Sequence, residues 1–351
     1  MSLDENVWRS LMPYRRYYSF IFISLTLITW LLVLPLSVHT NAQRRDSRGS
    51  APKSQQPTRK VRFTSGTSSL KIPLEIDNKI ILMPVSVNGS KPFKFIFDTG
   101  ASFSILNARR ADELGLKTQG EAEGTATGGK IQVSFIKGVS LSVQGAEVSD
   151  QTIGAFALPM PPGFEFDGII GYDFINQFVV EIDYLNKTMN LYDPATYHYS
   201  GKGESIPLIL GGRTPLARTK IILEGRAPLE ARLEVDTGGD NAFVLYSQIV
   251  KREKVLEATR NIGQETRRGG GGEEQVVDTQ FKAVQLGRFV FKNAPAQLAL
   301  KTERGGPDED GLIGGEILRR FKVILDYSRQ QMILEPNKSF NEPYDVEGGD
   351  N

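Results

Sequence analysis

Short apolar runs separated by turn residues fill most of the chain after residue 74. Residues 80–87 and 93–97 are two such runs, and Asn88-Gly89-Ser90 between them has the composition of a tight turn. This pattern predicts two antiparallel strands joined by a hairpin. Helix-like spacing of apolar positions is confined to two short stretches, residues 105–116 and 247–259. The pattern therefore predicts an all-β protein with few short helices.

The order of these runs is repeated along the chain. One apolar run leads into Asp98-Thr99-Gly100, and a later run leads into Asp236-Thr237-Gly238. Each motif is followed by an Asp-Gly-apolar-Ile-Gly stretch, and the interval from Asp98 to Gly168 nearly equals that from Asp236 to Gly311. A repeat that keeps its order and nearly its spacing predicts duplication of one β-rich lobe.

Asp98 and Asp236 are the candidate functional residues. A carboxylate at the end of a hydrophobic strand is costly to bury and needs a reason. The simpler interpretation is that each acid caps a backbone group in a turn, and we assign that role to Asp167 and Asp310. Two acids in the same repeated setting favour a pair that works together.

The N-terminal region resembles a targeting segment. Residues 20–38 are apolar and uncharged, arginines precede them, and small residues stand at Thr40 and Ala42. This arrangement predicts a signal peptide and an exported protein, periplasmic or secreted. The alternative is an uncleaved anchor, with membrane association through residues 20–38, because an apolar run of this length could just span a bilayer.

Composition excludes several kinds of site. The chain of 351 residues has no Cys and only two His, His39 and His198, so a thiolate nucleophile, a disulfide and a His-cluster metal site are excluded. A Ser-His-Asp site would have to use His198, which lies in a predicted connector. The net charge of +1 gives no reason to expect a nucleic-acid partner. We expect neither a metal nor another cofactor.

These observations divide the chain into five predicted segments. They are a signal peptide or membrane anchor (1–42), a flexible linker (43–70), an N-terminal catalytic lobe (71–200), a C-terminal catalytic lobe (201–340) and a polar tail (341–351).

The paired motifs resemble those of aspartic proteases of the pepsin and retropepsin type, especially exported single-chain bacterial forms. The resemblance in the order of strands and motifs extends over residues 74–336. It implies two β-barrel-like lobes, related by a pseudo-twofold axis, with a cleft between them. Retroviral forms make the pair by dimerising one lobe, whereas this chain carries both, so we expect a monomer.

The resemblance also implies the chemistry. Asp98 and Asp236 would activate a water to hydrolyse peptide bonds of a peptide or protein substrate. In such proteases two carboxylates about 3 Å apart cannot both ionise, so they share one proton. Thr99, Gly100, Thr237 and Gly238 would support the pair. The closing ψ-loop motifs would be Ile169, Ile170, Gly171, Leu312, Ile313 and Gly314. The alternative function is a catalytically weak peptide-binding or scaffold protein.

Two features depart from the family pattern. Many two-lobed members have Ser or Thr after each motif glycine, whereas this chain has Ala101 and Gly239. Losing those hydroxyl donors disfavours the ionised carboxylate, so we expect a less acidic pH optimum than that of a gastric enzyme. The candidate flap has no Tyr and comprises Gly124, Thr125, Ala126, Thr127, Gly128 and Gly129. Residues 267–273 are its second-lobe equivalent or a disordered surface loop.

Overall fold

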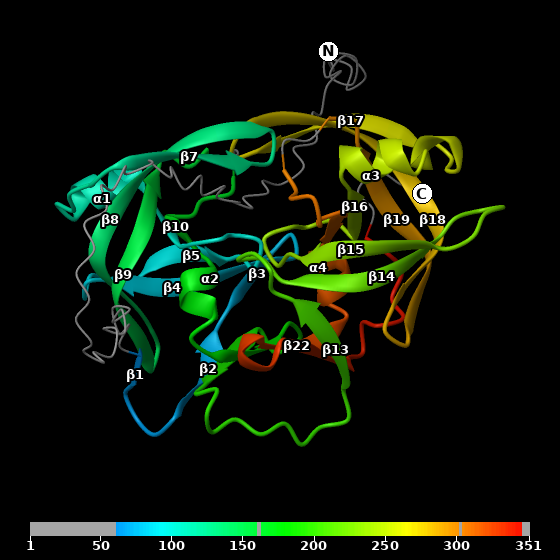
Figure 1. Ribbon diagram of the computed structural model, residues 1–351. Helices are drawn as coiled ribbons and strands as arrows, with labels where there is room; N and C mark the ends of the chain where they lie inside the picture. The colour runs from blue at the N-terminus through cyan, green and yellow to red at the C-terminus, as the bar shows by residue number, and fades with distance from the viewer. Residues whose placement is uncertain (1–60, 160–162, 302–303, 346–351) are drawn as a thin grey trace, which may run out of the picture.

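The computed structural model describes residues 61–159, 163–301 and 304–345, and is built almost entirely of strands (Figure 1). The first half contains β1 (Val61–Phe63), β2 (Ser68–Pro73), β3 (Glu75–Asp77), β4 (Ile80–Val87), β5 (Phe93–Phe97), β6 (Ile105–Asn107), α1 (Ala108–Glu113), β7 (Glu121–Ala126), β8 (Gly129–Val143), β9 (Ala146–Phe156), β10 (Gly168–Ile170), α2 (Tyr172–Ile175), β11 (Val179–Asp183) and β12 (Thr188–Tyr192).

The second half repeats this order. It contains β13 (Glu204–Ile209), β14 (Leu216–Ile222), β15 (Leu229–Val235), β16 (Phe243–Leu245), α3 (Ser247–Arg252), β17 (Gly263–Gly269), β18 (Gly272–Leu286), β19 (Phe289–Ala299), β20 (Gly311–Ile313), α4 (Gly315–Leu318), β21 (Phe321–Asp326) and β22 (Gln331–Pro336). Two 3₁₀ turns, η2 (Val255–Glu257) and η3 (Tyr327–Arg329), complete the elements. The prediction of an all-β, two-lobed aspartic protease fold with few short helices is confirmed.

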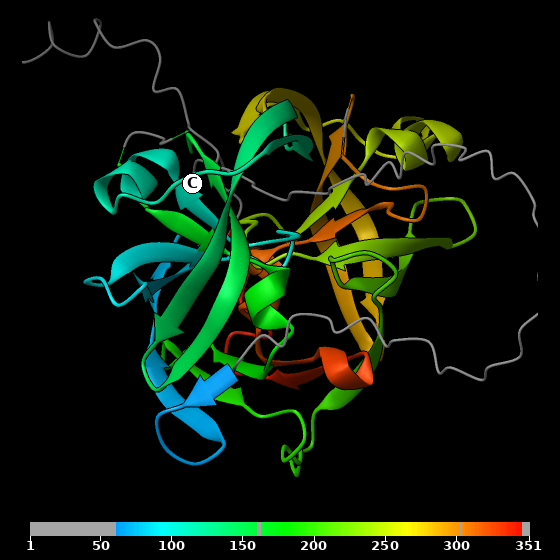
Figure 2. The same cartoon turned by 60° about the vertical axis from the view of Figure 1, so that its left-hand side comes forward.

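Strand pairing shows the duplication directly. In the first half β10 is parallel to β5 and antiparallel to β6, and β6 is parallel to β9. In the second half β20 is parallel to β15 and antiparallel to β16, and β16 is parallel to β19. The hairpins β7–β8 and β17–β18 also correspond. Figure 1 and Figure 2 show the two halves side by side, with these hairpins arching over the same end of the molecule.

A shared sheet joins the halves. Strand β11 pairs antiparallel with β21, with Val179 opposite Asp326 and Asp183 opposite Lys322. Strands β12 and β2 continue the sheet on one side, and β22 and β13 continue it on the other. The pairing is symmetric, because Asp183 and Asp326 occupy equivalent positions in the repeat. Backbone hydrogen bonds therefore cross directly from one half to the other.

The local sequence explains the strands that lead to the candidate site. Asn88 and Gly89 both have positive φ (49° and 75°), the backbone that a tight hairpin between β4 and β5 requires. Side chains Phe95, Ile96 and Phe97 are all buried, as expected for a strand covered on both faces. One hydrophobic cluster contains residues of both halves, from Ile72 to Leu334. The core is thus continuous across the shared sheet.

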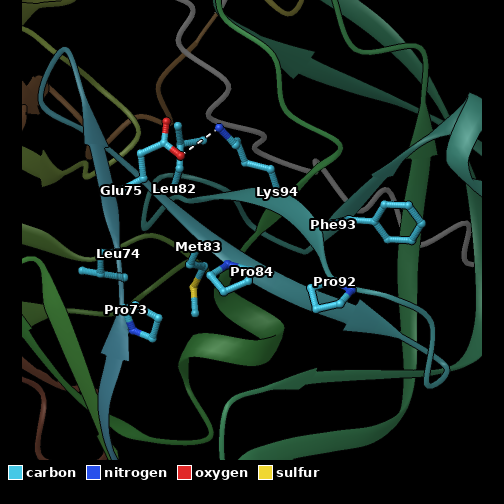
Figure 3. Close-up of a pocket in the computed structure, with 9 residues that line it drawn as sticks. All are labelled: Pro73, Leu74, Glu75, Leu82, Met83, Pro84, Pro92, Phe93 and Lys94. Carbon is cyan, nitrogen blue, oxygen red and sulfur yellow. Dashed lines mark ion pairs between the residues drawn. The ribbon is translucent and has the colours of Figure 1, made fainter.

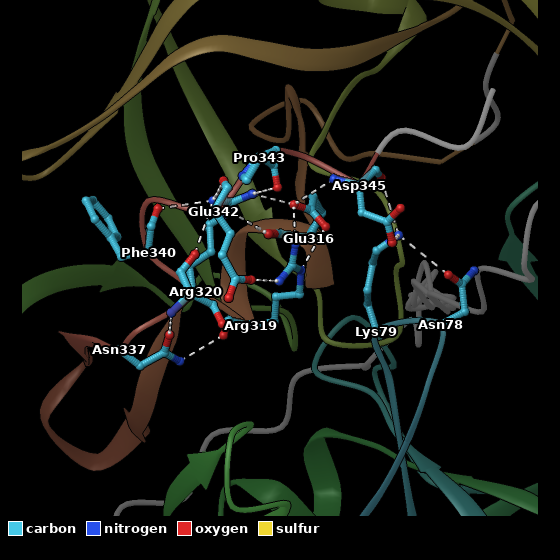
Figure 4. A network of polar contacts seen from close by, with 11 residues as sticks. Asn78, Lys79, Glu316, Arg319, Arg320, Asn337, Phe340, Glu342, Pro343 and Asp345 are labelled. Carbon is cyan, nitrogen blue, oxygen red and sulfur yellow. Dashed lines mark hydrogen bonds and ion pairs between the residues drawn. The ribbon is translucent and has the colours of Figure 1, made fainter. Parts of the chain in front are cut away.

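The last described residues pack against α4 (Figure 4). Arg320 is buried, pairs with Glu316 at 2.6 Å and donates to the backbone carbonyl of Glu342 at 2.7 Å. Lys79 of the first half forms an ion pair with Asp345 at 3.0 Å. Residues 341–345, which we assigned to a polar tail, therefore contact both halves.

Three details differ from the sequence prediction. Residues 61–70, expected to be linker, include β1 and the start of β2, which pair with β9 and β12. The helix expected over 105–116 begins only at Ala108, because residues 105–107 form β6 and Asn107 caps the helix. The helix expected over 247–259 is shortened to α3 and the separate turn η2. The apolar runs correctly marked burial but did not separate short strands from short helices.

The predicted signal peptide or anchor, residues 1–42, lies outside the described residues. Within the ranges that the structure covers, no helix has the length and apolar character needed to cross a membrane.

Candidate active site

Each Asp-Thr-Gly motif begins where a buried strand ends. Asp98 directly follows β5, and its backbone N–H donates to the carbonyl of Ile170 at 3.0 Å. Asp236 directly follows β15, and its N–H donates to the carbonyl of Ile313 at 2.9 Å. Strands β10 and β20 therefore run beside the motifs, where the resemblance had implied the ψ-loop motifs. Their pairing holds both acids at corresponding positions in the two halves.

The two threonines link the motifs across the halves. The Thr237 hydroxyl donates to the carbonyl of Phe97 at 2.7 Å, and the Thr99 hydroxyl donates to the carbonyl of Val235. The backbone N–H of Thr99 donates to Thr237 Oγ1 at 3.1 Å, and the N–H of Thr237 donates to Thr99 Oγ1 at 3.0 Å. All of these groups are buried. These reciprocal hydrogen bonds thus fix the distance between the loops.

The glycines bring the carboxyl groups together. Gly100 N–H donates to Asp98 Oδ1 at 2.8 Å, and Gly238 N–H donates to Asp236 Oδ1 at 2.9 Å. A methyl group on Gly238 would lie 2.4 Å from the Asp98 carboxyl carbon, and one on Gly100 would lie 3.0 Å from that of Asp236. Each carboxyl group therefore occupies the space beside the opposite glycine, and the two acids hydrogen-bond to one another.

Burial dominates the electrostatics of the pair. Both aspartates are 1% exposed. Burial, the negative charge of Asp236 and that of Glu234 hold the pKa of Asp98 well above its usual value. Burial also raises the pKa of Asp236, but Arg304 opposes this rise. Arg304 therefore favours the ionised form of Asp236 over that of Asp98.

A buried ionic cluster beside Asp236 was missed by sequence reasoning. Arg304, only 4% exposed, lies with its Nη2 2.8 Å from Glu234 Oε2 and 3.9 Å from Asp236 Oδ2. The Tyr246 hydroxyl donates to the same Glu234 oxygen at 3.1 Å. Glu234 continues the alternation of Glu230 and Arg232 with apolar residues, the pattern of a strand with one solvent-facing side, so nothing in the sequence marked it as buried. Arg304 lies far beyond Asp236 in the sequence, in a Gly-rich loop, and no local pattern marks it.

The candidate flap and its second-lobe equivalent meet over the site. The N–H of Gly271 donates to the carbonyl of Thr127 at 2.9 Å. A methyl group on Gly128 would lie 2.2 Å from the carbonyl oxygen of Gly272, so the two tips are in backbone contact. Residues 267–273 form the end of the β17–β18 hairpin, which favours the flap equivalent over the disordered loop that we had left open. The aspartates are closed off beneath both hairpins.

The remaining sequence candidates have structural positions. Asp167 accepts the N–H of Lys94 at 3.0 Å, and Asp310 accepts the N–H of Arg232 at 2.9 Å, the turn role that we assigned to both. Ala101 and Gly239 are buried behind the motifs, and their carbonyls accept backbone N–H groups of the α2 and α4 segments. Among the described residues no group of His, Asp or Glu is arranged to hold a metal ion.

A surface pocket lies away from this site (Figure 3). It has a volume of about 360 Å³ and is lined mainly by β3–β5 residues, with an ion pair of 2.8 Å between Lys94 and Glu75. Neither aspartate lines it. His198 lines a second pocket with tyrosines of the connector after β12, also apart from the aspartates.

Comparison with known families agrees with the first-half geometry. The family model described as Aspartyl protease matches residues 83–174, which span the stretch from within β4 to within α2 and include Asp98 and Ile169-Ile170-Gly171. The match supports an aspartyl protease family, and with it protease activity in general. A search of curated proteins found no match.

Proposed function

We propose that this protein is an aspartic endopeptidase of the two-lobed pepsin and retropepsin type, with Asp98 and Asp236 as its catalytic pair. The observation that carries the proposal is the pair itself. Two buried carboxyl groups contact one another, each bound by the N–H of its own motif glycine, on loops locked by Thr99 and Thr237.

The pair suits acid–base hydrolysis without a covalent intermediate. One member is ionised and takes a proton from a water held between the two acids, and the water oxygen attacks the peptide carbonyl. The protonated member donates to the carbonyl oxygen. Collapse of the tetrahedral intermediate transfers a proton to the leaving amine and regenerates the shared-proton state.

Substrate must reach aspartates that are closed off. The contact between Thr127 and Gly271 has to break for a peptide to enter, and the hairpins then close over it. We propose that the substrate is a peptide or protein, that a monomer is active because both motifs belong to one chain, and that the protein is exported or anchored outside the cytoplasm. The weak peptide-binding alternative is favoured by Gly239 and by the absence of a Tyr in the candidate flap.

Cleavage of a peptide library by the full-length protein tests the proposal. Asp98→Asn and Asp236→Asn each remove one member of the pair, so we expect at least a 10³-fold loss of kcat/KM in each, on the order of the effect of removing an acid–base group. Asp150→Asn is the matched control, because Asp150 is exposed and has a positive φ (55°) that Asn also tolerates. Full activity in either site variant would exclude the pair as the catalytic group, and binding without cleavage by the unaltered protein would favour the scaffold alternative.

A further inference from the structure

The pseudo-twofold repeat makes the two aspartates nearly equivalent, but the residues behind them differ. Ile96 precedes Phe97 in β5 and pairs with Ile169 of β10. At the same position in the second half, Glu234 of β15 pairs with Leu312 of β20. Ile96 belongs to an apolar cluster, whereas Glu234 is a buried acid. The symmetry of the catalytic pair is therefore broken on the Asp236 side.

Arg304 completes this asymmetry. Its guanidinium is 4% exposed and carries its positive charge 3.9 Å from Asp236 Oδ2. It also stands over the ring of Tyr246, with 5.3 Å between the guanidinium carbon and the ring centre. A buried charge is tolerated only where opposite charge and hydrogen bonds compensate it. Asp236 supplies the negative charge, and Glu234 accepts a hydrogen bond from Arg304 at 2.8 Å.

A second contact holds the guanidinium in this orientation. Arg304 Nη1 donates to Thr127 Oγ1 at 2.8 Å, a hydrogen bond that crosses from the second half to the tip of the first hairpin. The Arg304 guanidinium is thus held by two hydrogen bonds, one to Glu234 in β15 and one to Thr127 in the first hairpin. Both Glu234 and Thr127 are buried, so the guanidinium is held on two sides while the hairpin tips are in contact.

We propose that Arg304 is a positioning residue for the catalytic pair, holding the negative charge on Asp236 and leaving the shared proton on Asp98, with Thr127 orienting its guanidinium. The inference rests on the proposed function of the same pair. It assigns different roles to two acids that the repeat makes alike: Asp236 takes the proton from water, and Asp98 donates to the carbonyl oxygen.

The surrounding charges agree with this assignment. The ionisable groups that act on Asp236 are Asp98, Glu234, Arg304, Arg267, Tyr184 and Tyr246. Burial raises the pKa of Glu234 to about 8, with Arg304 lowering it and Asp236 raising it further. Below that pH Glu234 is protonated, so the positive charge of Arg304 is left to balance the negative charge of Asp236.

Titration of one acid at a time tests the inference. In protein labelled with ¹³C at the Asp carboxyl carbon, Asp98→Asn leaves Asp236 as the only acid of the pair, and Asp236→Asn leaves Asp98. We expect Asp236 to titrate at the lower pH. Adding Arg304→Gln to Asp98→Asn should raise the pKa of Asp236 by about one to three units, the usual effect of removing a cation at this distance. Titration of Asp98 below Asp236 would overturn the inference.

Matched variants separate positioning from a structural role. Arg320→Gln also removes a buried, carboxylate-paired arginine of the second half, but one paired with Glu316, and should leave the Asp236 titration unchanged. Arg304→Lys keeps the charge without the planar fork and should give a smaller shift, as should Thr127→Val. If Arg304→Gln does not fold, Arg304→Lys, Thr127→Val and the order of the two single titrations test the inference instead. An Asp236 titration that stays unmoved in Arg304→Gln, Arg304→Lys and Thr127→Val would contradict the positioning role of Arg304.

Activity distinguishes this inference from the function on which it rests. In Arg304→Gln the acid limb of the kcat/KM profile should move to higher pH by the same amount as the titration. Peptide cleavage with an acid limb that does not move would overturn the role of Arg304 alone. Absence of cleavage by the unaltered protein at every pH would overturn the proposed function. The carboxyl titrations would still report whether Arg304 sets the charge of Asp236.

Discussion

At the scale of single residues, the two motif glycines decide how close the proposed catalytic acids come to one another. Gly100 and Gly238 each stand beside the opposite carboxyl group, and their missing side chains are the space that this group occupies. Burial raises the pKa of both acids; the charge of Asp236 raises the pKa of Asp98 further, whereas the hydrogen bond from Asp98 opposes the rise at Asp236. The two glycines are not equal, since Asp98 lies closer to Gly238 than Asp236 lies to Gly100.

Alanine at these glycines should therefore damage the site unequally. Gly238→Ala would place a methyl group 2.4 Å from the Asp98 carboxyl carbon, whereas Gly100→Ala would place one 3.0 Å from that of Asp236. We expect a loss of kcat/KM on the order of 10²-fold for Gly238→Ala, because displacements of about 1 Å have this effect, and a smaller loss for Gly100→Ala. Steady-state kinetics on the two variants checks the order, and a reversed order would contradict the geometry.

Glu234 should make stability depend on pH. Its folded pKa of about 8 lies above the ordinary value of 4.5, so between these pH values the folded protein binds a proton that the unfolded chain releases. This contribution to stability is fully present below pH 4.5 and is lost as the pH rises toward 8. Each pKa unit corresponds to about 1.4 kcal/mol.

Glu234→Gln removes this titration and should gain stability relative to the unaltered protein as pH rises. We expect the difference in Tm between the two proteins to move in favour of the variant from pH 5 to pH 8. Glu230→Gln, on the same strand but exposed, is the control and should show no such trend. Thermal melts in a pH series provide the measurement, and a constant Tm difference would mean that Glu234 is ionised in the folded protein.

At the scale of elements, the proposed function requires the two hairpins to move. Their tips approach so closely that glycine is required on both sides of the contact, with Gly128 opposite Gly272 and Gly129 opposite Gly271. The direct backbone hydrogen bond between the tips is that from Gly271 to Thr127, and such a contact contributes only about 0.5–1.5 kcal/mol. Opening the tips also breaks the hydrogen bond from Arg304 to Thr127, so the proposed entry of substrate requires both contacts to be released.

Gly271→Ala should open the tips, because its methyl group would lie 2.2 Å from the carbonyl oxygen of Gly129. We expect roughly threefold to tenfold faster amide hydrogen exchange at residues 126–129 and 269–272, the change that loss of one hydrogen bond gives. Gly211→Ala is the control, since nothing lies within 4 Å of its added methyl group. Exchange rates that match in the two variants would show that the tips are not in contact in solution.

At the scale of the whole molecule, the shared sheet makes the two halves one unit. Strand β11 belongs to the first half and β21 to the second, and each completes the hydrogen bonding of the other. The apolar side chains of both strands lie in buried clusters, and the largest of these runs through both halves. The relative position of the two Asp-Thr-Gly loops therefore depends on the same contacts that hold the fold together.

Hydrogen exchange should show this coupling. We expect the amides of β11 and β21 to be the slowest in the protein and to exchange at equal free energies of opening, because neither strand can unpair without the other. Exchange measured by mass spectrometry over a denaturant series checks this. Loss of protection in one half while β11 and β21 stay protected would indicate two independent folding units.

Much of this architecture could be predicted from the sequence because local patterns determine it. The run from Phe93 to Phe97, the turn at Asn88-Gly89 and the repeated Asp-Thr-Gly motif each reflect a constraint within a few residues. Element type was harder, since residues 105–107 form a strand through pairing with β9 and β10. Short apolar runs take the structure that their neighbours impose.

The sequence by itself determined the duplication, the all-β fold and the two aspartates as a pair. Only the tertiary structure decided which cation makes the charges of the two aspartates unequal and which hairpins lie over them. Arg304 reaches Asp236 from a distant part of the chain, and the hairpin tips at Thr127 and Gly271 meet although they belong to different halves. The physical reason is that charge acts through space: the pKa of a buried carboxyl group depends on what packing brings within a few ångströms, and no periodicity along the chain records that.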